Sequence, residues 1–264
     1  MKFSPSFFAA ALLALAIAPT DALALTEAEA AAGRALVKRY ADTIVGVEMV
    51  VTLKGTQGDR PLPPREQKRE INGTMVAANG LTVLSLASID PRGSIPPAMM
   101  AQIHFDEPEF KEVKLRLADG TEIPARVVLK DADLDLAFIA PLPESAPAGP
   151  LPFVDLANHA EAIVLGTYYD ISRASKLQQR VPAVRVIYVS GMIEKPRRFV
   201  LASEYSPGCP SFAADGKVLG IALRHVAGGQ STSVIILPAE DVAEVAKEAA
   251  AIKPEPAAEA AKTP

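Results

Sequence analysis

Two side chains that could act as nucleophiles lie within one short segment, Tyr205-Ser206-Pro207-Gly208-Cys209-Pro210, called segment 205–210 below. The hydroxyl of Ser206 would need an adjacent base to take its proton. The thiol of Cys209 would need a cationic neighbour to lower its pKa, and would otherwise act as a small buried apolar side chain. Asp215-Gly216 then marks a turn before the apolar run Val218 to Ile221, which predicts a buried strand. A turn and a buried strand therefore follow the segment and would position it.

Candidate bases are few, because the chain has three histidines, His104, His159 and His225. The first lies in an insertion, the second in a later loop, and the third at the end of the predicted strand after the turn. Ser172 and Ser175-Lys176 hint at a Ser–Lys pair, but the stretch that carries them is predicted to be a polar loop. No base is therefore evident beside Ser206.

One acidic cluster is a candidate metal site. It consists of His104, Asp106, Glu107 and Glu109 around Pro108. Its spacing matches no recognised zinc or calcium pattern. The cluster is predicted to be a solvated acidic loop, and no metal or other cofactor is expected.

The N-terminus has the pattern of a secretory signal peptide over residues 1–24. Lys2 supplies a positive charge, Phe7 to Ala18 is apolar but too short to span a bilayer, and Ala22-Leu23-Ala24 fits a cleavage site. Cleavage would leave Leu25 as the first residue. With a single cysteine the chain forms no internal disulfide, and a periplasmic or secreted location is expected.

The net charge and the remaining apolar runs argue against two classes of partner, nucleic acids and membranes. The formal net charge of −4 gives no basic field for nucleic acid. After residue 24 no apolar run is long enough for a transmembrane helix, so no membrane association is expected once the signal is removed.

Hydrophobic periodicity predicts a helix over 25–45, with Thr26 as N-cap, and then β-structure. Gly55 to Glu70 is predicted to be a mobile loop, and Pro91 to Lys111 an insertion. The predicted strands of the first half are Val47–Leu53, Ile71–Ala78, Leu81–Leu86, Val113–Leu117, Ile123–Leu129 and Leu134–Ile139. Turn signals at short intervals between several of them are typical of an antiparallel barrel.

A proline-rich stretch, Pro141 to Pro150, divides the chain into a first β-domain, 46–143, and a second, 144–239. The predicted strands of the second half are Leu151–Val154, Ala162–Leu165, Val184–Ile193, Arg198–Ala202, Val218–Arg224 and Thr232–Leu237. Helical spacing returns over 240–252. Residues 253–264, rich in Ala, Pro, Glu and Lys, are predicted to be a disordered tail.

Several motifs occur in the order found in trypsin-like serine peptidases of the HtrA type. Val83 to Ile89 resembles the strand Val-Leu-Thr-Asn-Ala-His-Val that carries the catalytic histidine of that family. Asp133 to Ala137 resembles the Asp-Leu-Ala strand start that carries its aspartate. Val189 to Ile193 resembles Thr-Ser-Gly-Ile-Ile of its second barrel, and segment 205–210 precedes the turn that follows its nucleophile motif Gly-Asn-Ser-Gly-Gly-Pro. The resemblance covers about residues 43 to 240 and implies two six-stranded antiparallel β-barrels, with a helix at each end.

Carried over to this chain, the catalytic triad of the family is mostly missing. The histidine position falls on Ser88, whose hydroxyl is no base at neutral pH, and the nucleophile position falls on Pro207. The aspartate position is retained as Asp135, with an expected structural role. Pro207 also lacks the backbone N–H that would form one arm of the oxyanion hole.

The resemblance therefore implies an exported, catalytically inactive peptidase homologue, a pseudoprotease, that binds or scaffolds peptides, unfolded protein segments or another periplasmic protein. An alternative is an active serine- or cysteine-type endopeptidase with a displaced site at Ser206 or Cys209. A further alternative is an exported β-barrel binding module unrelated to peptidases.

Overall fold

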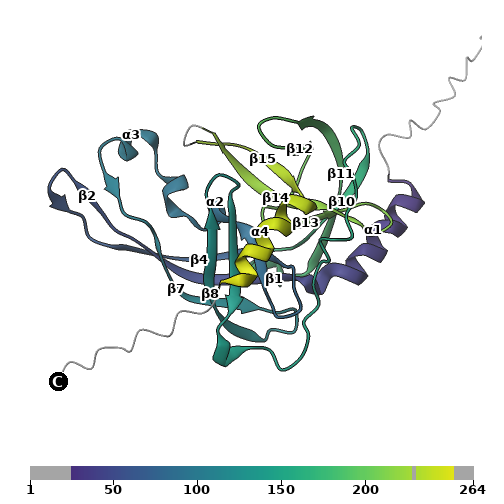
Figure 1. The fold of residues 1–264 in the computed structure, drawn as a ribbon, viewed down its shortest axis with the longest axis horizontal. Coiled ribbons are helices and arrows are strands. Elements are labelled where there is room, and N and C mark those ends of the chain that lie inside the picture. The colour runs from purple at the N-terminus through teal and green to yellow at the C-terminus, as the bar shows by residue number, and fades with distance from the viewer. Residues whose placement is uncertain (1–24, 228–229, 253–264) are drawn as a thin grey trace, which may run out of the picture.

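The computed structural model describes residues 25–227 and 230–252, and these form two closed β-barrels side by side (Figure 1). The predicted signal peptide 1–24 and tail 253–264 lie outside the described residues. Each barrel has six antiparallel strands, which confirms the predicted fold class. Among the described helices, none is long and apolar enough to cross a membrane.

The first barrel has the strand order β1-β4-β5-β9-β8-β7. Its strands are β1 (Ile44–Leu53), β4 (Arg65–Met75), β5 (Thr82–Ser85), β7 (Glu109–Arg116), β8 (Glu122–Asp131) and β9 (Leu136–Pro141). β1 pairs with β4 from Ile44↔Thr74 to Leu53↔Arg65, and β1 with β7 closes the barrel. All six strands predicted for this half are present.

The second barrel repeats this topology with the order β10-β11-β12-β15-β14-β13. Its strands are β10 (Thr167–Arg173), β11 (Pro182–Ile193), β12 (Phe199–Ala202), β13 (Pro210–Phe212), β14 (Val218–Ala227) and β15 (Gln230–Pro238). In both barrels the fourth strand lies beside the first, which is the Greek-key arrangement. The repeated order makes the fold compatible with the trypsin-like architecture.

Helices pack on the second barrel at both ends of the chain. α1 (Glu27–Tyr40) lies against β10 and β11, and α4 (Ala239–Ala251) against β14 and β15. α1 begins with a capping box in which Thr26 and Glu29 satisfy each other's backbone N–H groups, as the predicted N-cap requires. At its other end the Tyr40 ring stacks on Phe212, 4.1 Å between centroids, so the first helix of the chain is anchored to the second barrel.

The hydrophobic core has three parts. One fills the first barrel, a smaller one fills part of the second, and the largest runs between the barrels and under both helices. This shared core includes Val83 and Phe138 of the first barrel together with Ile221 and Leu223 of the second. The barrels are therefore packed on each other through buried apolar side chains.

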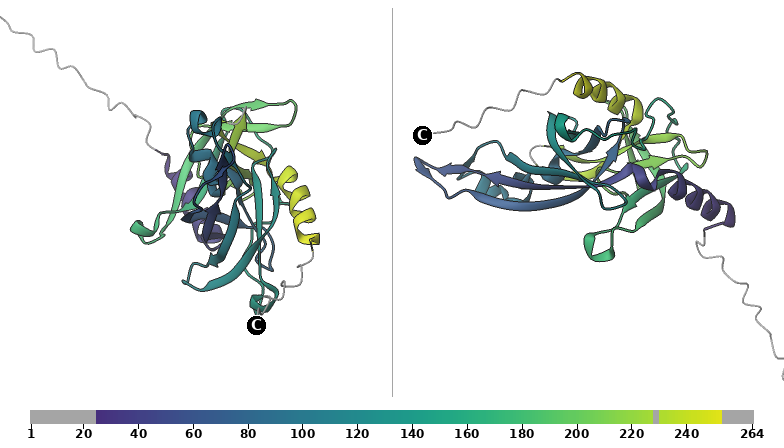
Figure 2. Two further views of the ribbon diagram at one scale, coloured as in Figure 1. Left: turned by 90° about the vertical axis from the view of Figure 1, so that its left-hand side faces the viewer. Right: turned by 90° about the horizontal axis from the view of Figure 1, so that it is seen from below.

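Short elements fill the insertions of the first barrel. They are α2 (Leu86–Ile89), α3 (Pro97–Met100), β2 (Gly55–Gln57), β3 (Arg60–Pro61), β6 (His104–Phe105) and the 3-10 helices η1 (Ala41–Thr43), η2 (Pro91–Ser94), η3 (Pro143–Ser145) and η4 (Lys176–Gln178). β3, β2 and β6 form a separate three-stranded sheet. It lies at the opposite end of the molecule from α1 (Figure 2).

Several predictions of secondary structure are wrong. Gly55 to Glu70 is no loop, because β2 and β3 form a hairpin there and β4 continues the β1 pairing as far as Arg65. The apolar runs 151–154 and 162–165 are irregular, and the strands in their place are β10 and β13. β10 was missed because its buried positions include the polar residues Asp170 and Ser172, and β13 because it has three residues and begins with proline.

Candidate functional site

Asp135 lies where the two barrels meet. It precedes β9 in a left-handed backbone conformation, with φ of 59°. Its carboxylate accepts hydrogen bonds from the first barrel, from Ser85 Oγ at 2.6 Å and from Ala87 N at 2.6 Å. From the second barrel it accepts one from Arg224 N at 2.7 Å. Three of about four acceptor sites on this carboxylate are thus occupied, which makes it a tie between the barrels.

Burial dominates the electrostatics of this group. Only 5% of Asp135 is exposed, and burial raises the pKa of its carboxyl from 3.8 to about 6, against the opposing effect of the hydrogen bonds from Ser85, Ala87 and Arg224. All three recorded donors are neutral groups. The charge of Arg224 also lowers the pKa of Asp135, but less than these hydrogen bonds do, so the carboxylate depends mainly on neutral donors.

Ser88 lies in α2, one residue after the Ala87 N–H that binds Asp135. Its side chain is half-buried. Ser88, the residue that the resemblance aligns with a histidine, therefore directly follows a residue whose N–H binds Asp135, and it carries a hydroxyl instead of an imidazole.

Segment 205–210 crosses onto the first barrel through Gly208. Its carbonyl accepts a hydrogen bond from Thr74 Oγ1 at 2.7 Å. The residue has φ of 83°, and a Cβ there would lie 2.4 Å from the backbone oxygen of Asn72. Only glycine fits this close approach in this backbone conformation.

Each backbone N–H of residues 206–209 already has a partner. Ser206 N donates to a buried carboxylate at 3.3 Å, Gly208 N to the Ala222 carbonyl at 2.7 Å, and Cys209 N to the Ser206 carbonyl at 3.0 Å. Pro207 has no N–H. An oxyanion hole needs donors aimed at the position of a developing negative charge. In this conformation, residues 206–209 offer none.

A chain of contacts joins the three family positions. Asp135 binds Ala87, the neighbour of Ser88, and it also binds Arg224 of β14. Two residues earlier on β14, Ala222 exchanges hydrogen bonds with Gly208 and Cys209, the two residues that follow Pro207. Recorded hydrogen bonds thus link Asp135, the neighbour of Ser88 and the residues after Pro207 along one seam between the barrels.

The carboxylate that binds Ser206 N belongs to Asp170, which sequence reasoning missed. Asp170 lies in β10, is fully buried, and burial raises the pKa of its carboxyl to about 6. Within the described chain its Oδ2 atom has no hydrogen-bond partner, although Arg185 Nη1 lies 4.0 Å from it. Ser211 Oγ, on the paired residue of β13, has no recorded partner either. The only sequence signal was an acidic residue inside the apolar run Tyr168 to Ile171.

The two displaced-site candidates have unfavourable surroundings. Ser206 Oγ accepts a hydrogen bond from Arg185 Nη1 at 3.1 Å, and a guanidinium cannot take a proton. Cys209 is fully buried, and burial, together with the nearby Asp170 charge, raises the pKa of its thiol well above its usual range. The thiolate needed for attack is therefore disfavoured.

None of the described histidine side chains lies at this seam. His104 is exposed on β6, and the exposed His159 places Nε2 3.5 Å from Glu240 Oε2 of α4. The backbone of His225 pairs with Ser233 between β14 and β15, and its side chain lies outside what the structure describes.

The other sequence candidates are dispersed. Ser172 is buried within β10 instead of lying in a polar loop, while Ser175 Oγ donates to Gln178 Oε1 at 3.2 Å. In the acidic cluster, Glu107 is paired with Lys130, and Glu109 with Lys54 and Lys111. Among the described residues no group of three or more His, Cys, Asp or Glu side chains is arranged to hold a metal.

Comparison with known proteins does not assign this chain to a family. No protein-family model matches this chain, and no curated protein matches it either. What stands is the architecture, two closed Greek-key barrels compatible with a trypsin-like fold, and the seam between them.

Proposed function

We propose that this protein is a non-catalytic relative of trypsin-like peptidases that binds extended peptide or unfolded protein segments. One observation carries the proposal. The backbone N–H groups of residues 206–209 are all bonded internally, and Pro207 lacks both hydroxyl and N–H. Loss of a single oxyanion-hole donor lowers the rate by about 10²–10³. This segment offers neither a nucleophile at the family position nor a donor for the charge that attack would create.

The aspartate supports the same reading. Asp135 is bonded to Ser85, Ala87 and Arg224, so its carboxylate serves as a structural tie between the barrels. The Ser88 hydroxyl beside it has no basic nitrogen to accept a proton. On this proposal the seam keeps the two-barrel packing of a trypsin-like fold but lacks the proton-transfer groups of a peptidase.

Binding of an extended peptide would use β14. β13 pairs with β14 only as far as Ile221, whereas β15 pairs with it as far as Ala227. On that other side Ala222 still exchanges hydrogen bonds with Gly208 and Cys209, and Arg224 N donates to Asp135. Beyond Arg224, no paired strand is recorded there within the described chain. Backbone groups along such an edge accept an added strand, with main-chain hydrogen bonds supplying affinity. A peptide bound there would lie at the seam that holds Asp135.

The test combines activity, labelling and binding on the mature protein. We expect no hydrolysis of casein, no labelling by a fluorophosphonate, and binding of fluorescently labelled unfolded casein measured by anisotropy. Hydrogen exchange should then show added protection over 225–227 when casein is bound. Absence of binding, or binding with protection confined to other regions, would overturn the proposal.

A displaced serine site is the second candidate, and the Asp170–Ser206 contact is what favours it. If casein is cleaved, Ser206→Ala and Asp170→Asn should each abolish cleavage. Cleavage that survives both but is lost in Cys209→Ala would point to the thiol instead. Either result would replace the non-catalytic proposal with an endopeptidase.

We also propose export to the periplasm or beyond the cell, on the pattern of residues 1–24 alone. The binding partner would then be an unfolded segment or another protein in that compartment.

A further inference from the structure

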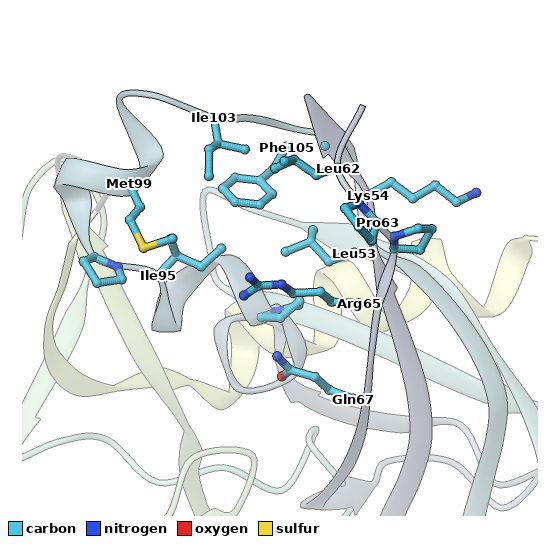
Figure 3. Close-up of a pocket in the computed structure, with 14 residues that line it drawn as sticks. Leu53, Lys54, Leu62, Pro63, Arg65, Gln67, Ile95, Met99, Ile103 and Phe105 are labelled. Carbon is cyan, nitrogen blue, oxygen red and sulfur yellow. The ribbon is translucent and has the colours of Figure 1, made fainter. Parts of the chain in front are cut away.

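A cavity of about 490 Å³ lies in the first barrel's insertions, outside the seam described above. It opens between the β1–β4 ribbon, the β2–β3–β6 sheet and the 91–105 segment (Figure 3). Its volume is within the range of about 300–1,000 Å³ for small-molecule sites. Apart from Leu53 and Lys54 at the end of β1, the lining comes from Gly55 to Glu70 and Pro91 to Lys111, the stretches predicted to be a loop and an insertion.

Backbone hydrogen bonds hold the walls of the cavity in place. Leu62 N donates to Gly55 O at 2.9 Å across the hairpin, and Asp106 N donates to Lys54 O at 3.1 Å. At the start of the 91–105 segment, the carboxylate of Asp90 accepts from Arg92 N at 2.8 Å and pairs with the Arg92 guanidinium. The cavity is therefore a defined feature of the insertions.

The lining is mostly apolar. Its apolar side chains are Leu53, Leu62, Pro63, Pro64, Pro91, Ile95, Pro96, Met99, Ile103 and Phe105. Met99 keeps 41% of its surface exposed. Apolar side chains gathered around a cavity favour an occupant with a hydrocarbon body.

One cation, the solvent-exposed Arg65, borders this apolar space. The guanidinium of Arg65 points into the cavity in Figure 3, and no ion pair or hydrogen bond of its side chain is recorded within the described chain. Lys54, the other basic residue of the lining, points away and is paired with Glu109. Gln67 is the remaining polar side chain of the lining. The cavity therefore presents a single unpaired positive charge beside an apolar interior.

We propose that this cavity binds an alkyl carboxylate, with the hydrocarbon chain among the apolar side chains and the carboxylate on Arg65. A guanidinium is suited to a carboxylate because it donates two parallel hydrogen bonds. A peptide in this cavity would bring amide groups that need hydrogen bonds, and the lining has few polar side chains to supply them. An alkyl chain has no such groups. The site is separate from the β14 edge, so it does not depend on the function proposed above.

The test is isothermal titration calorimetry of the mature protein with dodecanoate and with dodecanol as the uncharged match. Wild-type protein should bind dodecanoate more tightly than dodecanol. Arg65→Ala should weaken dodecanoate binding about 10-fold, the low end of what a hydrogen bond to a charged group contributes. Its affinity for dodecanol should stay unchanged.

Lys68→Ala is the matched control, because it removes an equal charge from the same strand at a residue outside the lining. It should bind dodecanoate as wild type does. Met99→Asp, at a half-exposed position where folding tolerates a polar side chain, should weaken both ligands. No binding of dodecanoate by wild type, or equal losses in Arg65→Ala and Lys68→Ala, would overturn the proposal. Preference for an apolar peptide over dodecanoate would also overturn it.

Discussion

Asp135→Asn should change the pH dependence of stability in a direction that reveals how the carboxyl is held. Burial raises the pKa of Asp135 from 3.8 to about 6 in the folded protein. Between these values the folded state holds a proton that the unfolded state has lost, so the contribution of this group to stability falls as the pH rises. A difference of about two pH units corresponds to about 3 kcal/mol.

The loss of stability caused by Asp135→Asn should therefore become smaller as the pH rises. The free energy of unfolding of wild type minus that of Asp135→Asn should be about 2.4 kcal/mol smaller at pH 7 than at pH 4, because the unfolded carboxyl is already partly protonated at pH 4. Asp170 also has a raised pKa, but it is present in both proteins and shares no recorded hydrogen-bond partner with Asp135, so its effect cancels. Urea unfolding followed by far-ultraviolet circular dichroism measures the difference, because the chain has no tryptophan.

Asp215→Asn is the matched control. Hydrogen bonds from Lys217 lower the pKa of the exposed Asp215 carboxyl, so the corresponding difference should rise with pH instead of falling. A difference for Asp135→Asn that stays constant from pH 4 to pH 7, or rises, would refute the reasoning. It would mean that a cation, such as a protonated imidazole, stabilises the ionised carboxylate in the folded protein.

Three further predictions concern segment 205–210 and the N-terminus. Gly208→Ala should lower stability by about 2–4 kcal/mol, because a Cβ there would clash with the Asn72 carbonyl. Gly120→Ala, at a residue with φ of 88° and open space around it, should cost only about 1–2 kcal/mol. Equal costs of the two substitutions in urea unfolding would contradict the clash. Ser88→His with Pro207→Ser should not restore strong hydrolysis of casein, because the N–H groups of Gly208 and Cys209 remain bonded internally; vigorous serine-directed activity would show otherwise. Exported protein should begin at Leu25 by N-terminal sequencing, and an unprocessed N-terminus would rule out cleavage after Ala24.

The first barrel and both terminal helices could be predicted from the sequence. Their strands alternate or run apolar between Gly- and Asp-containing turns, and the helices carry local caps and a 3.6-residue pattern, so short-range chemistry was enough. The second barrel was predicted less well, since Asp170 and Ser172 occupy buried positions of β10. Polar residues are mostly exposed in folded proteins, so a strand with polar residues at buried positions is predicted from its sequence to be a loop.

The sequence by itself determined which groups are missing. Proline at 207 carries neither hydroxyl nor N–H in any fold, and a serine at 88 is no base. Only the tertiary structure decided how the remaining groups are used. It bonded Gly208 N to Ala222 and joined Asp135 to Arg224 across 89 residues of sequence. It also built a cavity from two stretches about 40 residues apart, with Arg65 facing Ile95 and Met99. Hydrogen-bond partners and cavities depend on contacts between distant segments, and no local pattern of residues encodes them.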